Sequence, residues 1–106
     1  MIKINLSDFF QGWIIGNFEP SIFRSTEIEV AIKQYKAGHV EVKHFHKIAT
    51  EITIMIIGEA MFNDEHLFEG EGMIIKPNES NTFKAITDCK TLVIKTPSIP
   101  SDKYLK

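Results

Sequence analysis

The chain has 106 residues, which suits one domain and leaves no segment long enough for a second core. Apolar residues make up 43% of the chain and charged residues 25%, values that exclude a disordered or collagen-like protein. The formal net charge is -2 and no run of Lys and Arg forms a basic stripe. We therefore expect a small-molecule ligand, and neither nucleic acid nor membrane as a partner.

The longest apolar runs are short, and the N-terminus lacks the basic and apolar regions of a signal peptide. Ile54 to Ile57, for example, is far below the roughly 18 residues that a membrane span needs. Cys89 is the single cysteine, so no internal disulfide can form, which suits a reducing compartment. We expect a cytoplasmic protein.

In the first third of the chain, short alternating runs predict strands, and no stretch has a sustained helical period. Ser7 is a candidate cap for one helical turn through Phe10, and residues 13–15 are a candidate edge strand. Residues 27–32 predict a half-buried strand, because their apolar members at 28, 30 and 32 share one face.

After a turn at Ala37-Gly38, residues 39–46 alternate again. Strict alternation predicts one face formed by Val40, Val42, His44 and His46, and the opposite face formed by His39, Glu41, Lys43 and Phe45. Residues 51–57 are apolar on both faces, which predicts a strand covered on both sides, with a subunit interface as one candidate cover.

The rest of the chain continues the β pattern. A hairpin is predicted at 60–68, with short strands at 73–75, 81–85 and 91–95. The tail from Pro97 contains two prolines and is expected to run over the surface. The predicted class is all-β.

Three residues form a candidate metal site. His44 and His46 are two positions apart on one strand, so their side chains project to the same side. Glu51 follows after a turn-length gap, on a strand that would pair antiparallel with the first. Two imidazoles and one carboxylate form a mixed nitrogen and oxygen set that suits one divalent ion, Fe, Mn, Ni, Co or Zn, with positions left open.

These residues resemble the first motif of the cupin family: Gly, five residues, His-x-His, three or four residues, Glu, six residues, Gly. Every fixed position is filled, by Gly38, His44, His46, Glu51 and Gly58. The second cupin motif resembles residues 70–81, with Lys76-Pro77-Asn78 in place of its Pro-x-Gly turn. Asn81 stands where cupins usually have a third histidine.

The resemblance implies a cupin-type jelly-roll β-barrel in a single domain, 1–106. Its barrel core would span about 27–96, with the N-terminal segment 1–26 and the C-terminal tail 97–106 packed on it. Cupins often pair through sheet faces or edges. Since outward Ile52, Ile54, Ile56 and Phe45 leave a large apolar surface, we expect a homodimer.

The departure at Asn81 leaves two roles open: a residue that holds substrate or acts as a weak fourth ligand, or an ordinary turn residue. Thr53, Met55 and Phe83 share the predicted inward faces and are expected to line a cavity. His39 and His66 are expected to be solvated. Tyr35 and Lys95 are candidate proton donors that the sequence does not place inside.

The function that we predict is that of a small metal-binding cupin, which holds one divalent ion in the barrel and binds or acts on a small oxygenated molecule. One alternative is a metal-free sugar or sugar-nucleotide isomerase or epimerase with His44 or His46 as general base. Another is a small-molecule-binding module without turnover. Fold alone does not decide among them.

Overall fold

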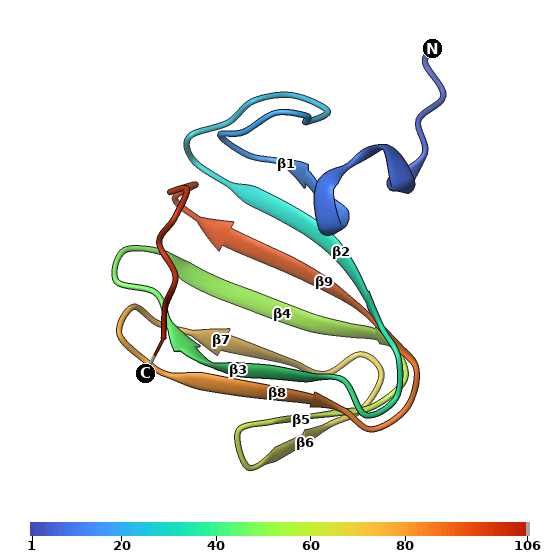
Figure 1. Cartoon of the computed structure of the whole chain (residues 1–106), viewed down its shortest axis with the longest axis vertical. Coiled ribbons are helices and arrows are strands. Elements are labelled where there is room, and N and C mark those ends of the chain that lie inside the picture. The colour runs from blue at the N-terminus through green and yellow to red at the C-terminus, as the bar shows by residue number, and fades with distance from the viewer. Residues whose placement is uncertain (106) are drawn as a thin grey trace.

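Two five-stranded antiparallel sheets face one another in the computed structural model, which describes residues 1–105 (Figure 1). The first sheet contains, in spatial order, β1 (Trp13–Ile15), β2 (Glu29–Tyr35), β9 (Cys89–Thr96), β4 (Thr50–Ile57) and β7 (Gly72–Ile75). The second contains β10 (Tyr104–Leu105), β3 (Val40–Phe45), β8 (Asn81–Ala85), β5 (Ala60–Phe62) and β6 (Glu65–Leu67). The all-β jelly-roll prediction is confirmed.

Two short 3-10 helices, η1 (Leu6–Asp8) and η2 (Phe10–Gly12), precede β1. The cap of η1 is Asn5 and not Ser7: the Asn5 side chain accepts a hydrogen bond from the backbone N–H of Ser7 at 3.0 Å. The side chain of Asp8 accepts one in return from the N–H of Asn5, which completes a capping box. Within residues 1–105, no helix is long and apolar enough to cross a membrane, and the cytoplasmic location stays a prediction.

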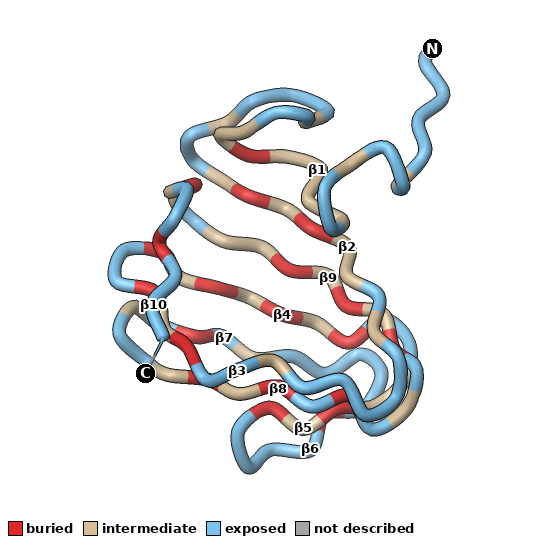
Figure 2. The backbone as a smooth tube through the Cα atoms, viewed as in Figure 1, coloured by how far each residue is buried: buried red, intermediate tan, exposed pale blue. Residues whose placement is uncertain are grey.

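Buried residues alternate along the strands, and the interior is divided between an apolar and a polar part (Figure 2). The hydrophobic core is formed by Met55, Ala60, Phe62, Leu67, Ile75, Phe83, Ala85 and Cys89. The buried polar residues include His44, His46, Glu51, Asn81 and Asp102. Burial of so many polar groups requires hydrogen-bond partners or a ligand, so this second part of the interior marks the candidate site.

A β-bulge in β3 overturns the predicted faces of that strand. Glu41 pairs with Phe83 and His44 pairs with Asn81, so three steps along β3 match two steps along β8. The extra residue reverses the alternation. Val40 and Val42 are therefore each 60% exposed, while the histidines remain buried. Strict alternation had placed these four side chains on one face, and that prediction is wrong.

Strand β4 has the predicted alternation over most of its length. Glu51, Thr53 and Met55 are buried, and the register with β9 shifts after Met55, so Ile57 is exposed. In β2, residues 28, 30 and 32 do share a face, but the buried face is the opposite one, with Glu29 and Ala31. Glu29 tolerates this because the Ser98 hydroxyl donates to its carboxylate at 3.0 Å.

The two glycines that flank the histidine motif have different steric surroundings. Both have left-handed backbone, with φ of 89° at Gly38 and 85° at Gly58. A Cβ at Gly38 would meet nothing within 4 Å, whereas a Cβ at Gly58 would lie 2.4 Å from the carbonyl oxygen of Asp88. Gly58 is therefore favoured both by its left-handed backbone and by the close approach of Asp88, whereas Gly38 is favoured by its left-handed backbone alone.

We expect Gly38→Ala to lower the free energy of unfolding by about 1 to 2 kcal/mol, the cost of a Cβ in left-handed backbone. Gly58→Ala should cost a further 1 to 3 kcal/mol, roughly, because the backbone at Asp88 must shift. Urea denaturation of the two variants measures the difference. Equal losses would show that the close approach at Gly58 carries no energetic weight.

Candidate metal centre

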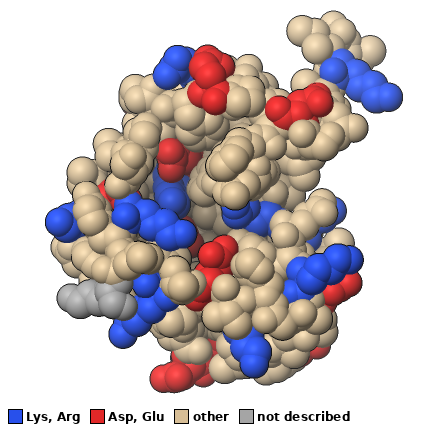
Figure 3. All heavy atoms as spheres, in the orientation of Figure 1, with Lys and Arg blue, Asp and Glu red and all other residues tan. Residues whose placement is uncertain are grey.

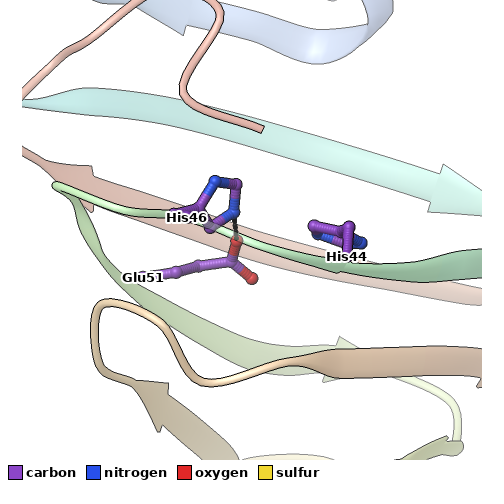
Figure 4. Close-up of side chains that lie close together, drawn as sticks. All are labelled: His44, His46 and Glu51. Atoms are coloured by element: carbon purple, nitrogen blue, oxygen red, sulfur yellow. Dashed lines mark hydrogen bonds and ion pairs between the residues drawn. The ribbon is translucent and has the colours of Figure 1, made fainter. Parts of the chain in front are cut away.

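Side chains from β3, from the residue after it and from β4 meet inside the barrel (Figure 4). His44 lies on β3 and His46 directly follows that strand, while Glu51 is the second residue of β4. One potential ligand atom from each side chain lies within 4.8 Å of the others, and all three residues are buried. The structure therefore brings together the three residues that the sequence predicts as metal ligands.

Hydrogen bonds select the tautomer of both histidines. In His44, Nδ1 lies 2.9 Å from the carbonyl oxygen of Val42, and in His46, Nδ1 contacts the carbonyl oxygen of Asp102. A carbonyl oxygen only accepts, so each Nδ1 carries the proton and donates it. In each neutral ring, Nε2 is then left with a free lone pair, which is the state a metal-ligating histidine needs.

The shortest contact within the group is between Nε2 of His46 and Oε1 of Glu51, 3.2 Å apart. With Nδ1 protonated, a neutral His46 has a lone pair at Nε2, and an ionised Glu51 also presents lone pairs. Two acceptors at this distance require a positive charge between them, either a proton on His46 or a cation. The two donor atoms 3.2 Å apart are compatible with one metal ion at about 2.1 Å from each, and the potential ligand atom of His44 lies within 4.8 Å of both, so the three residues form a set that fits a metal.

The carboxyl group of Glu51 is held in its ionised form. Burial raises its pKa, but hydrogen bonds from His46 and from the Thr53 hydroxyl outweigh this effect, and the pKa lies below the ordinary value. The Thr53 hydroxyl donates to Oε2 at 2.8 Å. Burial also lowers the pKa of His44, so its ring is neutral at pH 7. Both groups are therefore ready to ligate.

The C-terminal tail holds the loop between β3 and β4 in place through Asp102, a residue that the sequence analysis did not identify as part of the site. The buried carboxylate of Asp102 accepts backbone hydrogen bonds from residues 47, 48 and 49, at 3.0, 3.0 and 2.9 Å. Its carbonyl oxygen accepts from His46. Asp102 thus fixes both the ring of His46 and the approach to Glu51, and the tail is part of the site.

Asn81 lies beside the histidines, as the motif comparison implied. It is the cross-strand partner of His44 and is 2% exposed, so its side chain shares the inward face. Its Nδ2 is buried without a hydrogen-bond partner. The turn before it is formed by Asn78, whose left-handed φ of 70° replaces the glycine of the cupin pattern and whose N–H donates to the carbonyl oxygen of His46.

A cavity of about 1100 Å³ opens next to the ligand group, and the hollow in Figure 3 has charged atoms on its wall. His44 and Glu51 form part of that wall. The N-terminal segment from Asn5 to Trp13 contributes a side of the cavity, and Lys103 of the tail contributes another. The segments outside the predicted core, 1–26 and 97–106, therefore help to shape the site.

Three residues expected outside the site, or left unplaced, lie in this wall. His39 is exposed, as expected, and also borders the cavity, with its ring 4.9 Å from that of Tyr35. The bulge turns Glu41 toward the cavity. The hydroxyl of Tyr35 donates to Glu41 at 3.4 Å, and burial raises its pKa well above the ordinary value. Lys95 also lines the cavity. The orientation of Glu41 depends on the bulged pairing of β3 with β8, and no local sequence pattern indicates such a bulge.

The three residues expected to line the cavity, Thr53, Met55 and Phe83, lie outside its wall. Met55 and Phe83 are 0% and 5% exposed and belong to the hydrophobic core. The hydroxyl of Thr53 donates a hydrogen bond to Glu51. Inward orientation was predicted correctly, but close packing fills that part of the barrel and displaces the cavity toward β2 and the N-terminal segment.

Comparison with known proteins agrees with this fold. No family model and no curated protein sequence matches the chain. Among solved structures, a Klebsiella pneumoniae protein described as having a double-stranded β-helix domain matches with a TM-score of 0.71 and 19% identity, over 79% of this chain and 74% of the other. An RmlC-like cupin from Desulfovibrio desulfuricans matches with a TM-score of 0.64 and 24% identity, over 74% and 79%.

A third similar structure is a metalloprotein. Oxalate decarboxylase from Bacillus subtilis, described as having Mn(II) centres, matches with a TM-score of 0.68 and 17% identity, over 76% of this chain. The match spans only 24% of the enzyme. The chain has the double-stranded β-helix fold of the cupins, and its His-His-Glu group lies within that fold.

We expect Asp102→Ala to lower the free energy of unfolding by about 2 to 4 kcal/mol, because backbone donors of the 47–49 loop lose their acceptor. Metal affinity should fall about 10- to 100-fold, because the tail that carries the carbonyl acceptor of His46 loses its carboxylate contacts with the 47–49 loop. Asp64→Ala, an exposed turn position, is the control and should change stability by less than about 0.5 kcal/mol. Native metal affinity in Asp102→Ala would contradict this role.

Proposed function

We propose that the protein is a small metal-dependent cupin that holds one divalent ion through His44, His46 and Glu51 and binds or acts on a small oxygenated molecule in the adjacent cavity. One observation carries this proposal: Nε2 of His46, whose Nδ1 donates to a carbonyl oxygen, and the ionised carboxylate of Glu51 face each other at 3.2 Å. Such a pair needs a positive charge between its members. When bound, a divalent ion would supply Lewis-acid or oxygen-activating chemistry there.

The donor set limits the choice of ion. Two imidazoles and a carboxylate suit Fe, Mn, Ni, Co or Zn, whereas Mg²⁺ and Ca²⁺ prefer oxygen ligands. The Mn(II) centres of the similar decarboxylase support an ion of this group. With three protein ligands, positions remain for a ligand on the side of the cavity wall that His44 and Glu51 form.

We assign to Asn81 the orientation of the bound molecule. Its buried Nδ2 is a hydrogen-bond donor without a partner, and such a donor costs free energy until an acceptor oxygen reaches it. Because it lies across from His44, an oxygen of the substrate near the metal ligands would be within its reach. Its replacement of the usual third histidine keeps one more position accessible to substrate.

A metal titration tests the proposal. We expect native protein purified without a chelating tag to carry about one divalent ion per chain by elemental analysis. His44→Ala should largely abolish binding, whereas Asn81→His should tighten it by supplying a fourth ligand. His66→Ala is the matched control, because this exposed histidine lies 2.9 Å from Glu59 and does not belong to the ligand group.

Two results would contradict the assignment. If native protein binds no divalent ion, the metal-free isomerase or epimerase, with His44 or His46 as general base, becomes the better hypothesis. If Asn81→His leaves affinity and metal preference unchanged while His44→Ala destroys both, Asn81 has no role at the metal.

We also propose a homodimer through the outer face of the first sheet. Aliphatic side chains from three adjacent strands are cross-strand neighbours there: Ile52 pairs with Ile74 on one side and with Ile94 on the other. Ile74 is 66% exposed and Ile56 is 47% exposed. A continuous aliphatic sheet face of this kind is typical of a surface covered by a second copy. The ring of Phe45, also expected to contribute, packs against that of Tyr104, with ring centroids 5.5 Å apart and an angle of 31° between the ring planes.

Light scattering coupled to size-exclusion chromatography tests the dimer. We expect native protein to have a dimeric mass at micromolar concentration, and Ile74→Lys to be monomeric, because a lysine on this face would be buried without a partner. Val40→Lys is the matched control: Val40 is 60% exposed but lies on the other sheet. A monomeric native mass, or equal loss of dimer in both variants, would contradict an interface on this face.

A further inference from the structure

Three lysines gather in the cavity wall next to the metal ligands: Lys33, Lys95 and Lys103. Lys33 is the cross-strand partner of the fully buried Thr91, and Lys95 is the partner of Glu51, so both project inward. Lys103 comes from the C-terminal tail. Segments far apart in the sequence thus bring three ammonium groups to one hollow.

None of the three lysines forms an ion pair within 4.0 Å in residues 1–105. The ammonium group of Lys33 donates to the carbonyl oxygen of Gln11 at 3.0 Å and lies 5.5 Å from the centre of the Trp13 ring. That of Lys95 lies 5.0 Å from the same ring. These positively charged groups contact neutral acceptors and an aromatic face, although carboxylates are present in the same wall.

The acidic groups of the wall are already engaged. Glu41 accepts from Tyr35 and lies 3.7 Å from His39, and Glu51 belongs to the ligand group. A fourth lysine of the wall, Lys36, is paired with Asp88 at 3.8 Å. The other three lysines against these two carboxylates leave a net charge of +1, and a divalent ion would raise it to +3. A hollow with this excess of positive charge attracts an anion and disfavours a neutral or cationic molecule.

The rest of the wall indicates what carries the anionic group. Apolar residues line the side formed by the N-terminal segment and β9: Leu6, Phe9, Trp13 and Val93. Such a surface contacts carbon, which a bare inorganic anion does not offer. At the other end, Asn81 provides a donor and the metal ligands provide a position for oxygen.

We propose that the cavity binds a small organic acid, with a carboxylate held by Lys33, Lys95 and Lys103 and a second oxygen at the His44, His46 and Glu51 group. This rests on the proposed function and specifies its substrate class. Burial lowers the pKa of Lys33; Glu41 opposes this shift, and Lys103 and Lys95 add to it, in agreement with like charges that lack a counterion. A bound carboxylate would supply that counterion.

The binding of succinate to the Mn(II)-loaded protein tests the proposal. The fluorescence of Trp13 reports binding, because Trp13 is the single tryptophan and lines the cavity. We expect succinate to change the emission of Trp13 and succinamide, its neutral diamide, to bind at least about tenfold more weakly. Lys33→Gln and Lys95→Gln should each weaken succinate about tenfold. Lys84→Gln, an exposed position on β8, should change its affinity by less than about twofold.

Lys103→Gln should weaken succinate by about threefold, and this exposed tail position keeps the test valid if either inner variant fails to fold. Equal succinate affinity in native protein and in the folded lysine variants would overturn the proposal, as would tight binding of succinamide. Tighter binding of inorganic phosphate than of succinate would overturn the organic acid assignment.

Mn(II) titration without succinate, on the same proteins, separates this proposal from the proposed function. If Mn(II) binds and succinate does not, the metal assignment stands and the organic acid fails. If Mn(II) does not bind, the proposed function fails, and the comparison of succinate between native and lysine variants, repeated without metal, still decides whether the lysines hold the acid.

Discussion

The contact between Nε2 of His46 and the carboxylate of Glu51 is the interaction on which the site depends, because a neutral His46 with its proton on Nδ1 and an ionised Glu51 both present lone pairs there. Asp102, in the C-terminal tail, sets up this contact in two ways. Its carbonyl oxygen fixes the proton of His46 on Nδ1, and its carboxylate holds the loop that leads to Glu51. A barrel interior that keeps two acceptors in contact requires a positive charge between them, which a proton or a cation supplies.

The division of the interior follows from that requirement. Apolar side chains close the barrel around Met55 and Phe83, which removes water from one side of the ligand group. The other side stays open to a cavity whose wall comes from the N-terminal segment, β2 and the tail. Stability is thus concentrated in the packed part, and the polar part is free to bind a charged molecule. The lysines next to the metal ligands fit this arrangement, since a bound anion would neutralise both their charge and that of a bound metal ion.

Local patterns in the sequence were sufficient for the fold class and for the ligand group. Two-residue alternation identifies strands, and the His-x-His pair with Glu51 identified the three candidate ligands. The expected antiparallel pairing of their strands is wrong: β3 and β4 belong to different sheets, and the ligands meet across the interior between the sheets. The alternation rule failed for Val40 and Val42, because one extra residue in β3 changes which side chains face inward. A bulge is a property of the pairing with β8, and the sequence of β3 by itself has no mark of it.

By itself, the sequence therefore determined an all-β jelly roll, the identity of the three candidate ligands and the unusual asparagine at position 81. The tertiary structure alone decided which groups surround them. Asp102, Lys33 and Lys95 reach the site from segments up to 70 residues apart in the sequence, roughly, and only long-range strand pairing and the path of the tail bring them there. Charge and hydrogen bonding at a site depend on distance in space, which local periodicity does not specify.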